Sequence, residues 1–465
     1  MDTINGLKKL GKETNANVFI TGGYVRDFLR NKNNEDLDIS VHGISLKEVE
    51  KFLSKIGSVK SFEIHKIEGT TPIRVLMYRG KDGIEAQITT TKHKICTISS
   101  KINTKLILRQ DSNHRDFSIN AMYMPINNMT KTGIVDFHSG KNDIKAKQIL
   151  TVGSAKKRFR ESPIRILRAF SLAARFNYKI TAHTKEGIAE CCSYLKKVSQ
   201  EAIRFELIDI IMSKKPSKYF KLMEELGVLE IILPELHRCV KCWQDKRYHK
   251  YDVFHHLIYA CDSTEPNLVI RLSALFHDIG KPASLNLIGT KRTFYKHEVM
   301  GSKEAALILR RLKFDNKIIQ EVTHLIRMHM YHYTREYSDA GIRKFINNAG
   351  VKEADLNNLK NFPLFKLRRA DRAGNGFRKK LTTDRQLDFE KRIIEVFNSS
   401  KGLSIKDLCI NGNDLMEIFS LTPGKSVGDV LHYLLERILE EPELNEKEQL
   451  FRISLDYIRS KLIKN

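Results

Sequence analysis

Hydrophobic and polar positions alternate over several short stretches in the first 150 residues. Four of these stretches are rich in β-branched residues and are bounded by turn-forming residues: NVFITGG, LDISVHG, PIRVLMY and IEAQITTT. Alternation with a period of two places one set of side chains on the buried face of a sheet and the other set on the opposite face. Residues 1–150 are therefore predicted to form a small domain around a mixed β-sheet.

From about residue 155 the spacing of apolar residues changes from two to three or four. Only breaks that contain Gly or Pro interrupt this helical spacing in RILRAFSLAARF, AIRFELIDIIM and YFKLMEELGVLEIIL. Such spacing gathers the apolar side chains on one face of an amphipathic helix. The predicted fold class is α+β, in which a small mixed-sheet head is followed by a largely all-α body.

The composition indicates a multidomain protein with a polyanionic partner. The 465 residues suffice for about three domains, each able to bury a core. There are 80 Lys plus Arg against 55 Asp plus Glu, a formal charge of +25. This excess favours nucleic acid over a membrane surface, although an AT-rich genome also raises the Lys content.

Localisation and redox state follow from what the sequence lacks. It has no apolar run of about 18 residues, and its start lacks both the apolar stretch of a signal peptide and the Arg-rich, acid-poor face of a transit peptide. The seven cysteines are odd in number and irregularly spaced, which favours reduced thiols. We therefore expect a cytoplasmic protein.

A lone Cys239-Val-Lys-Cys242 lacks two further ligands at a usual spacing, so a structural zinc there is disfavoured.

The stretch VFITGGYVRDFL at 18–29 is typical of a strand, a Gly-Gly turn and the start of a helix. Gly22 and Gly23 let backbone N–H groups approach phosphate oxygens closely. The helix N-terminus and Arg26 supply positive potential at the same place. This segment is suited to hold a triphosphate.

Two carboxylates follow in the next extended segment, LDIS. Asp36 and Asp38 are two positions apart, so they lie on the same side of one strand. Carboxylates this close repel each other unless cations lie between them. Two Mg²⁺ ions about 4 Å apart would relieve the repulsion, one bridging nucleotide phosphates and the other activating an attacking hydroxyl.

Each half of this segment has a simpler interpretation when taken alone. Paired glycines commonly form a tight turn, and an acidic pair is commonly a solvated loop before an edge strand. Both halves occur within 19–40, in the order strand, turn, helix, strand. That order favours a phosphate and metal site.

These motifs resemble the class II nucleotidyltransferases, which comprise tRNA CCA-adding enzymes and bacterial poly(A) polymerases. The head signature of this family, GG-x-VRD followed by D-x-D, is matched at 22–27 and 36–38. A second signature, RRDFTxNA, is matched by HRDFSINA at 114–121, with His114 and Ser118 at the two changed positions. The resemblance implies that the triphosphate and ribose of the incoming nucleotide are contacted by Arg115, Asp116 and Asn120.

A third signature, EDPxRxLRAxRFAA, resembles RFRESPIRILRAFSLAARF at 158–176, where Glu161, Arg165 and Arg168 match. In these enzymes the Asp and the Arg three residues later bind the Watson–Crick edge of C or A, so that the protein acts as the template. Here the Asp position is Ser162. A hydroxyl brings no charge, so selection of the amine-bearing bases is expected to be weaker or to shift to Glu161.

The metal site departs from the family pattern as well. The family commonly carries a further carboxylate on a strand that reads E-V-T-T-x-R, and the matching stretch QITTTK begins with Gln87. Glu85 lies two residues earlier on the same strand face and is a candidate replacement.

A second group of candidate residues begins with His277-Asp278, after an apolar helical run. A structural histidine is commoner than a ligand at such a position. However, further His and Asp residues recur on successive predicted helices and can converge in a bundle core on one or two metal ions. The pattern resembles an HD-type metal phosphohydrolase domain, which many bacterial members of the same family carry. By this resemblance a divalent transition metal is held by His256, His277, Asp278 and Asp371, with His297 and His329 as candidates for a second metal.

The resemblance extends to the end of the chain, where LSIKDLCINGNDLMEIFSLTPGKSVGDVLHYLLERILEEPELN is similar to the region described as an RNA-gripping tail. Four domains are predicted. They are a nucleotidyltransferase head at 1–150, a neck for base and RNA 3′-end recognition at 151–230, an HD-type domain at 231–385 and a tRNA-binding tail at 386–465.

The function implied by the resemblance is the template-independent addition of CCA to tRNA 3′ ends. The cofactor would be Mg²⁺, the substrates CTP and ATP, and the partner the tRNA acceptor arm. No membrane and no obligate protein partner is expected. A poly(A) polymerase or a partial CC- or A-adding enzyme would use the same parts. Two hypotheses of other classes are an HD phosphohydrolase acting on RNA ends with a degenerate head, and a non-catalytic RNA-binding scaffold.

Overall fold

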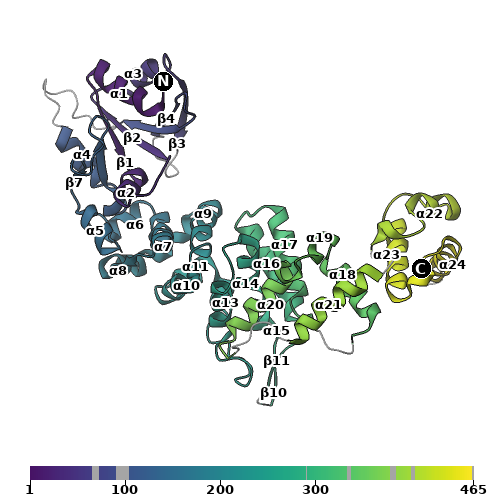
Figure 1. Cartoon of the computed structure of the whole chain (residues 1–465). Helices are drawn as coiled ribbons and strands as arrows, with labels where there is room; N and C mark the ends of the chain where they lie inside the picture. The colour runs from purple at the N-terminus through teal and green to yellow at the C-terminus, as the bar shows by residue number, and fades with distance from the viewer. Residues whose placement is uncertain are drawn as a thin grey trace. The chain divides into compact units, whose positions relative to one another are not determined.

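The computed structural model of the chain describes residues 1–64, 73–90, 104–289, 291–331, 337–377, 384–399 and 404–462. They divide into two compact units, Met1–Pro234 and Glu235–Asn465 (Figure 1). This division lies close to residue 231, and the four predicted domains remain predictions. Among the helices that the structure describes, none has the length and apolarity needed to cross a bilayer.

A seven-stranded mixed sheet organises the first unit, with the order β3-β4-β5-β2-β1-β6-β7. β2 pairs in parallel with β5, and the other neighbours are antiparallel. The four stretches predicted from alternation are β1, β2, β4 and β5, so the mixed-sheet head is confirmed. The strands are β1 (Asn17–Thr21), β2 (Leu37–His42), β3 (Ser58–Ile64), β4 (Ile73–Arg79), β5 (Glu85–Thr90), β6 (Met122–Pro125) and β7 (Val135–Asp136).

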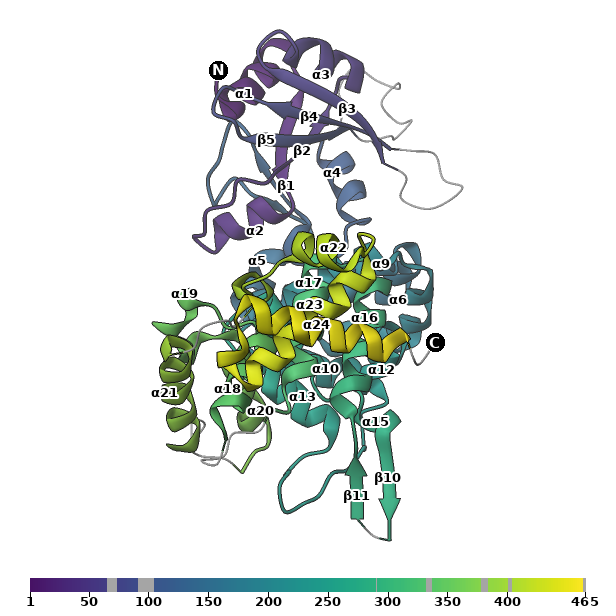
Figure 2. The same cartoon turned by 90° about the vertical axis from the view of Figure 1, so that its right-hand side faces the viewer.

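The two faces of this sheet carry different residues. α1 (Thr3–Thr14) and α3 (Leu46–Leu53) cover one face, and α4 (Thr104–Ser112) packs on the other (Figure 2). The side chains of β1 and β2 that pack under α1 and α3 alternate along each strand: Val18, Ile20, Leu37, Ile39 and Val41. Asp38 therefore lies on the face of α4, as strand alternation requires.

Short helices complete the first unit. Serine or threonine caps begin three of them, because Ser154, Thr181 and Ser199 each accept a hydrogen bond from a backbone N–H of the first turn. The small parallel pair β8 (Gln148–Ile149) and β9 (Lys179–Ile180) lies among them. The helices are α2 (Gly23–Leu29), α5 (Gly140–Ala146), α6 (Ala155–Glu161), α7 (Ile164–Phe176), α8 (Ala182–Cys191), α9 (Gln200–Ile211), α10 (Pro216–Glu225) and α11 (Val228–Ile232), and α12 (Pro234–His237) begins at the last residue of this unit.

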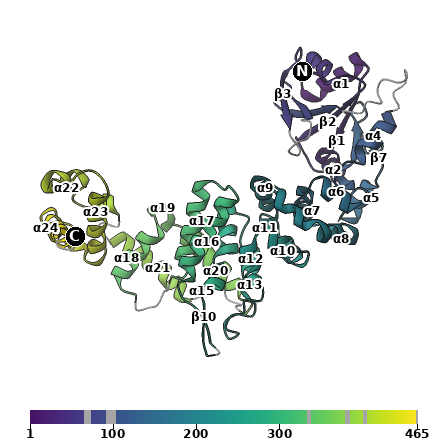
Figure 3. The same ribbon diagram turned by 180° about the vertical axis from the view of Figure 1, so that it is seen from behind.

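Among its described residues, the second unit is helical apart from one hairpin, β10 (Leu285–Ile288) and β11 (Lys291–Phe294) (Figure 3). In the part of the unit that the structure describes, one apolar cluster joins α13, α14, α17, α18, α20 and α21, and another joins α22, α23 and α24. The largely all-α body is thus confirmed. Its helices are α13 (Val253–Asp262), α14 (Leu268–Phe276), α15 (Lys281–Ser284), α16 (His297–Arg311), α17 (Asn316–Met328), α18 (Asp339–Ala349), α19 (Glu353–Leu356), α20 (Pro363–Gly374), α21 (Asp384–Ser399), α22 (Gly412–Phe419), α23 (Lys425–Glu440) and α24 (Lys447–Leu462).

Candidate functional site

The turn after β1 brings the backbone close to a carboxylate of β2. Gly22 has a φ of +70°, a conformation that glycine adopts freely and other residues rarely adopt. A Cβ atom built on Gly22 would also lie 2.7 Å from Oδ2 of Asp38. Position 22 therefore requires glycine for two independent reasons, and the missing side chain keeps the space beside the carboxylate open.

Asp36 and Asp38 line the same cavity. The prediction that both lie on one strand is wrong for Asp36, because β2 begins at Leu37 and the exposed Asp36 precedes it. Burial raises the pKa of Asp38, the charge of Asp36 raises it further, and Arg115 and Arg168 act in the opposite direction. A cation beside the pair would offset this repulsion. Two carboxylates fit Mg²⁺, which usually keeps several waters and needs only one or two protein oxygens.

Gln87, which stands where the family has a further carboxylate, is the register partner of Asp38 across the parallel β2–β5 pair. Its neutral amide adds no charge to that of the aspartates. Glu85 is exposed at the start of β5, and neither residue lines the cavity. Replacement of the carboxylate by Glu85 therefore remains a prediction.

A hydrogen-bond network fixes Arg26 at the wall of the cavity. Its guanidinium donates to both oxygens of Asp27, at 3.1 and 2.7 Å, and to Oδ1 of Asn120 at 2.9 Å. Asn120 in turn donates to Oδ1 of Asp116 at 3.3 Å. Arg115 is held by Asp111 at 3.2 Å. These cations are therefore oriented before any ligand arrives, which lowers the ordering cost of binding an anion.

Arg168 connects the head to the neck. Its Nη1 lies 3.0 Å from Oδ2 of Asp116, and its Nε lies 3.3 Å from Oε1 of Glu206 on α9. Burial raises the pKa of Asp116, but Arg168, a hydrogen bond from the Phe117 backbone N–H and the charge of Arg165 together hold it below the ordinary value. Burial instead leaves the pKa of Glu206 raised, despite Arg168 and a hydrogen bond from Ser171.

Arg168→Gln is expected to destabilise the protein by about 2 kcal/mol at pH 7, because two buried carboxylates lose their shared cation while solvent partly screens the exposed guanidinium. Arg168→Lys should recover part of the loss, since one ammonium cannot bridge both carboxylates. Urea unfolding of the full chain measures both values. A loss below about 0.5 kcal/mol for the glutamine variant would mean that the bridge contributes little.

The cavity has a volume of about 350 Å³ and contains nine of the predicted residues: Gly22, Gly23, Arg26, Asp36, Asp38, Arg115, Asp116, Asn120 and Arg168. The remaining lining residues were not predicted from the sequence: Asn34, Ser171, Leu172, Arg175, Phe205, Glu206 and Asp209.

Three predicted residues lie outside this cavity. Arg165 donates to Oε2 of Glu161 at 3.2 Å, to the Arg158 carbonyl at 3.3 Å and to the His114 carbonyl at 2.8 Å. Glu161 also accepts from Arg158 at 2.6 Å, and Ser162 is the C-cap of α6. The predicted contacts of Glu161, Ser162 and Arg165 with the base therefore remain predictions. The charged side chains of Glu161 and Arg165 are already bonded to each other and to nearby groups.

Six side chains converge in the second unit, from the helices and helix ends on which they were predicted. Each is buried except Asp371, which is partly buried. α13 provides His256, the end of α14 provides His277 and Asp278, and α20 provides Asp371. The start of α16 and the end of α17 provide His297 and His329.

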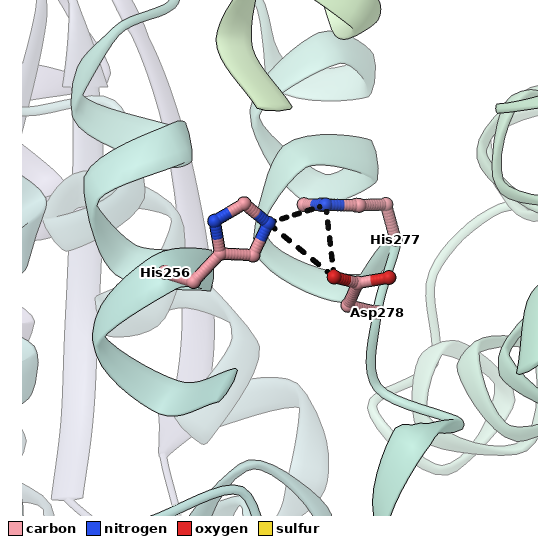
Figure 4. A group of neighbouring side chains, drawn as sticks. All are labelled: His256, His277 and Asp278. Carbon is pink, nitrogen blue, oxygen red and sulfur yellow. Dashed lines mark hydrogen bonds and ion pairs between the residues drawn. The ribbon is translucent and has the colours of Figure 1, made fainter. Parts of the chain in front are cut away.

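One side of this group is formed by His256 and His277, whose Nε2 atoms are 3.0 Å apart (Figure 4). Oδ2 of Asp278 lies 3.3 Å from Nε2 of His256 and 3.5 Å from Nε2 of His277. Oδ1 of Asp371 lies 3.3 and 3.7 Å from the same two nitrogens. Two nitrogens and two carboxylate oxygens thus converge on one point, as ligands of a divalent metal do.

The other carboxylate oxygen of Asp278 faces two further histidines. Oδ1 lies 3.1 Å from Nε2 of His297 and 3.6 Å from Nε2 of His329. Ligand atoms of His256, His277 and Asp278, and likewise of Asp278, His297 and His329, lie within 4.8 Å of one another. Asp278 is therefore placed to bridge two metal positions.

Backbone carbonyls orient three of these imidazoles. Nδ1 lies 3.0 Å from the Ala274 carbonyl in His277, 2.7 Å from that of Phe294 in His297 and 2.7 Å from that of Ile326 in His329. A donor at Nδ1 leaves the lone pair on Nε2, which is the atom aimed at the carboxylates. This arrangement is usual for metal-ligating histidine. The donor set of imidazoles and carboxylates fits a divalent transition metal.

The charge in this group is balanced by its own cations. Burial lowers the pKa of His256, but contacts with Asp278 and Asp371 outweigh it and raise the pKa to about 9. Lys281, which was not predicted, places Nζ 2.5 Å from Oδ2 of Asp278 and 2.7 Å from Oε1 of Gln244. A cavity of about 210 Å³ opens beside the group and is also lined by His249, Arg368 and Arg372. The carboxylates thus attract positive charge, and cationic side chains border the space where an anion would enter.

Three family models match the chain. The model described as "Poly A polymerase head domain" matches residues 18–150, "Probable RNA and SrmB- binding site of polymerase A" matches 177–240, and "tRNA nucleotidyltransferase domain 2" matches 297–453. Together they cover most of the chain in a consistent order.

Individual proteins with a similar sequence or structure are also named as tRNA nucleotidyltransferases or CCA-adding enzymes. The CCA-adding enzyme of Lactococcus lactis is 24% identical over 93% of this chain and 92% of its own length. The A-adding tRNA nucleotidyltransferase of Deinococcus radiodurans is 25% identical over 71% of this chain and 75% of its own. The crystal structure of the Bacillus stearothermophilus CCA-adding enzyme in complex with CTP covers 100% of this chain and 98% of its own, with a TM-score of 0.62 and 19% identity, and so shares the fold.

Proposed function

This chain belongs to the class II nucleotidyltransferase family of tRNA CCA-adding enzymes and bacterial poly(A) polymerases, and from this premise we propose that it adds C and A from CTP and ATP to tRNA 3′ ends without a nucleic acid template. The observation that carries the proposal is the cavity in which two close carboxylates face a set of oriented arginines. The family generally uses a divalent metal, and Mg²⁺ is the ion that we propose for Asp36 and Asp38. The excess of basic residues would hold the tRNA acceptor arm, and the protein would act in the cytoplasm.

The side chains of the cavity have different proposed roles in nucleotide binding and metal binding. Arg26, Arg115 and Arg168 would hold the triphosphate by charge-assisted hydrogen bonds, and Asn120 with Asp116 would contact the ribose. Asp36 and Asp38 would hold Mg²⁺, which supplies Lewis-acid stabilisation of charge on the phosphate oxygens and a more acidic hydroxyl. In the reaction the RNA 3′-hydroxyl attacks the α-phosphate of CTP or ATP in line and pyrophosphate leaves. The protein contributes position and charge neutralisation.

Incubation with Mg²⁺ and three tRNA transcripts tests this function. The transcripts end before CCA, after C and after CC, and CTP and ATP are offered separately and together. Sequenced 3′ ends should show each transcript completed to CCA and a stop after one A. Long A tails would identify a poly(A) polymerase, and addition restricted to C or to A would identify a partial enzyme. Failure to extend any transcript would exclude the transferase function.

The second unit supports a further candidate function, metal-dependent phosphohydrolysis. The specific observation is the carboxylate of Asp278 between two groups of imidazoles, with Lys281, Arg368 and Arg372 at the adjoining cavity. Such an arrangement suits activation of water next to a phosphate ester. RNA ends that carry a phosphate are the substrates to test.

A further inference from the structure

A carboxylate and a cationic donor at the base edge can recognise cytosine or adenine, and the predicted residues are poorly placed to supply them. Arg165 is engaged by Glu161 and by two backbone carbonyls, and Ser162 carries no charge. Neither residue lines the cavity that contains Asp38. Another part of the cavity wall is therefore the better candidate for reading the base.

The cavity extends along two packed helices, α7 and α9. Arg168, Ser171 and Arg175 are spaced by three and four residues on α7, so they share one face of that helix. Phe205 and Asp209 are four residues apart on α9 and likewise share a face. Glu206 joins the two helices through Arg168 and Ser171. This packing places Arg175, Phe205 and Asp209 in one wall of the cavity, together with Arg168, which contacts Asp116.

Phe205 is 71% exposed although it lines a cavity. An aromatic ring in this position presents a flat apolar face to whatever enters, and stacking of a nucleobase on such a ring is favourable for every base. Its neighbours on α9, Ile203 and Leu207, are buried in the core. The exposure of Phe205 is therefore not shared by the apolar residues around it.

Arg175 and Asp209 provide the two groups that the base edge needs. Among the residues that the structure describes, neither side chain has a hydrogen-bond partner, and Arg175 acts on Asp209 through its charge. A carboxylate accepts a hydrogen bond from the exocyclic amine that cytosine and adenine share, and a guanidinium donates to the adjacent ring acceptor. Uracil and guanine present a carbonyl where the amine would be, and a carboxylate repels it.

We propose that Phe205, Arg175 and Asp209 form the base-recognition site of this chain. Phe205 stacks on the base of the incoming nucleotide, Asp209 accepts from its exocyclic amine and Arg175 donates to its ring acceptor. The inference rests on the proposed nucleotidyl transfer and names the residues that select its substrate.

Asp209→Asn tests the edge contact. Its amide can donate to the carbonyl of uracil, so the preference for CTP over UTP is expected to fall by about tenfold to a hundredfold. The preference is measured as the ratio of kcat/KM values on the transcript that lacks CCA, and as the ratio of dissociation constants from calorimetry without RNA. Glu201→Gln, an exposed acid on the same helix outside the cavity, is the matched control and should leave both ratios unchanged.

Phe205→Leu tests the stacking contact. We expect it to weaken the binding of CTP and ATP by about tenfold without changing the preference for either over UTP, whereas Phe205→Trp should bind as tightly as the original chain. Arg175→Lys keeps the charge but loses the planar guanidinium with its paired donors. It should weaken CTP binding and leave the contribution of Phe205 stacking to affinity unchanged.

Two results would overturn the base-recognition site. One is an unchanged nucleotide preference in Asp209→Asn while Ser162→Asp sharpens it, which would place the base at α6. The other is a loss in Phe205→Leu confined to the KM for tRNA, which would assign the ring to the RNA. Failure of the unsubstituted chain to extend any transcript would exclude the proposed function. The base-recognition site would still be tested in that case, because calorimetry measures the nucleotide preference without RNA or reaction.

Discussion

Asp38→Asn should reduce nucleotide addition by about a thousandfold or more while leaving the metal-free protein no less stable than before. The loss of rate follows from losing a charged ligand of the metal ion, whose stabilisation of the transition state is of the order of several kcal/mol. Single-turnover extension of a tRNA transcript that lacks CCA measures it. Asp36→Asn should also reduce the rate of addition, because it removes the second carboxylate that we propose for the ion.

The expected change in the free energy of unfolding for Asp38→Asn is opposite in sign to that of most substitutions of buried residues. The pKa of Asp38 is raised by burial and by Asp36, so its charged form is disfavoured in the folded protein. Stability of the metal-free protein is therefore gained as the pH falls through this raised pKa, and above it the ionised carboxylate is a cost. Asparagine removes that cost at neutral pH. Added Mg²⁺ should raise the melting temperature of the original chain and have little effect on that of Asp38→Asn.

Glu35→Gln is the matched control for both measurements, because Glu35 is an exposed acid next to Asp36 and does not line the cavity. It should keep full activity. Retention of more than about a tenth of the activity by Asp38→Asn would contradict the assigned role, since it would mean that the carboxylate contributes less than about 1.4 kcal/mol.

Asp278→Asn is expected to abolish tight metal binding in the second unit and to leave nucleotide addition unchanged. Both oxygens of Asp278 face imidazole nitrogens, so one substitution weakens both metal positions. His297→Gln should remove only the position that faces Oδ1, which reduces the metal content without eliminating it. Metal analysis after incubation with Mn²⁺ or Ni²⁺ measures the content of each variant.

The same variants separate the two candidate activities. Release of phosphate from RNA ends should disappear in Asp278→Asn and persist in Glu265→Gln, an exposed acid elsewhere in the second unit. If Asp278→Asn does not fold, His297→Gln carries the test through its reduced metal content. Unchanged metal content in both variants would contradict the proposed centre, and a parallel loss of CCA addition would mean that the two units do not work independently.

Local patterns in the sequence predicted the head sheet and the part of the cavity formed by Gly22, Gly23, Arg26, Asp36 and Asp38, whereas the other predicted cavity residues came from the resemblance to the family. Leu37, Ile39 and Val41 alternate with Asp38 because they pack under α1 and α3, so the carboxylate had to face the other way. Gly22 was predicted from a motif, and its positive φ and its closeness to Asp38 give the physical reason. The histidines of the second unit were predicted from their recurrence on successive helices and from the resemblance to an HD-type domain. His256 lies within α13, His297 begins α16, and His277 and His329 directly follow α14 and α17.

The remaining residues depend on tertiary packing that local patterns do not encode. Phe205 and Asp209 have an ordinary helical spacing, and only the packing of α9 against α7 brings them to the cavity of Asp38. The engagement of Arg165 by backbone carbonyls has no sequence signal either. Lys281 follows His277-Asp278 closely in the chain, and an HDxxK pattern could have drawn attention to it.

The measurement that tests the central claim most directly is a crystal structure with CTP and Mn²⁺, in which anomalous scattering locates the ion. We predict an ion about 2.0–2.2 Å from carboxylate oxygens of both Asp36 and Asp38 and in contact with the phosphates of the nucleotide. Carboxylates that turn away from each other, with CTP bound and no ion between them, would contradict the account.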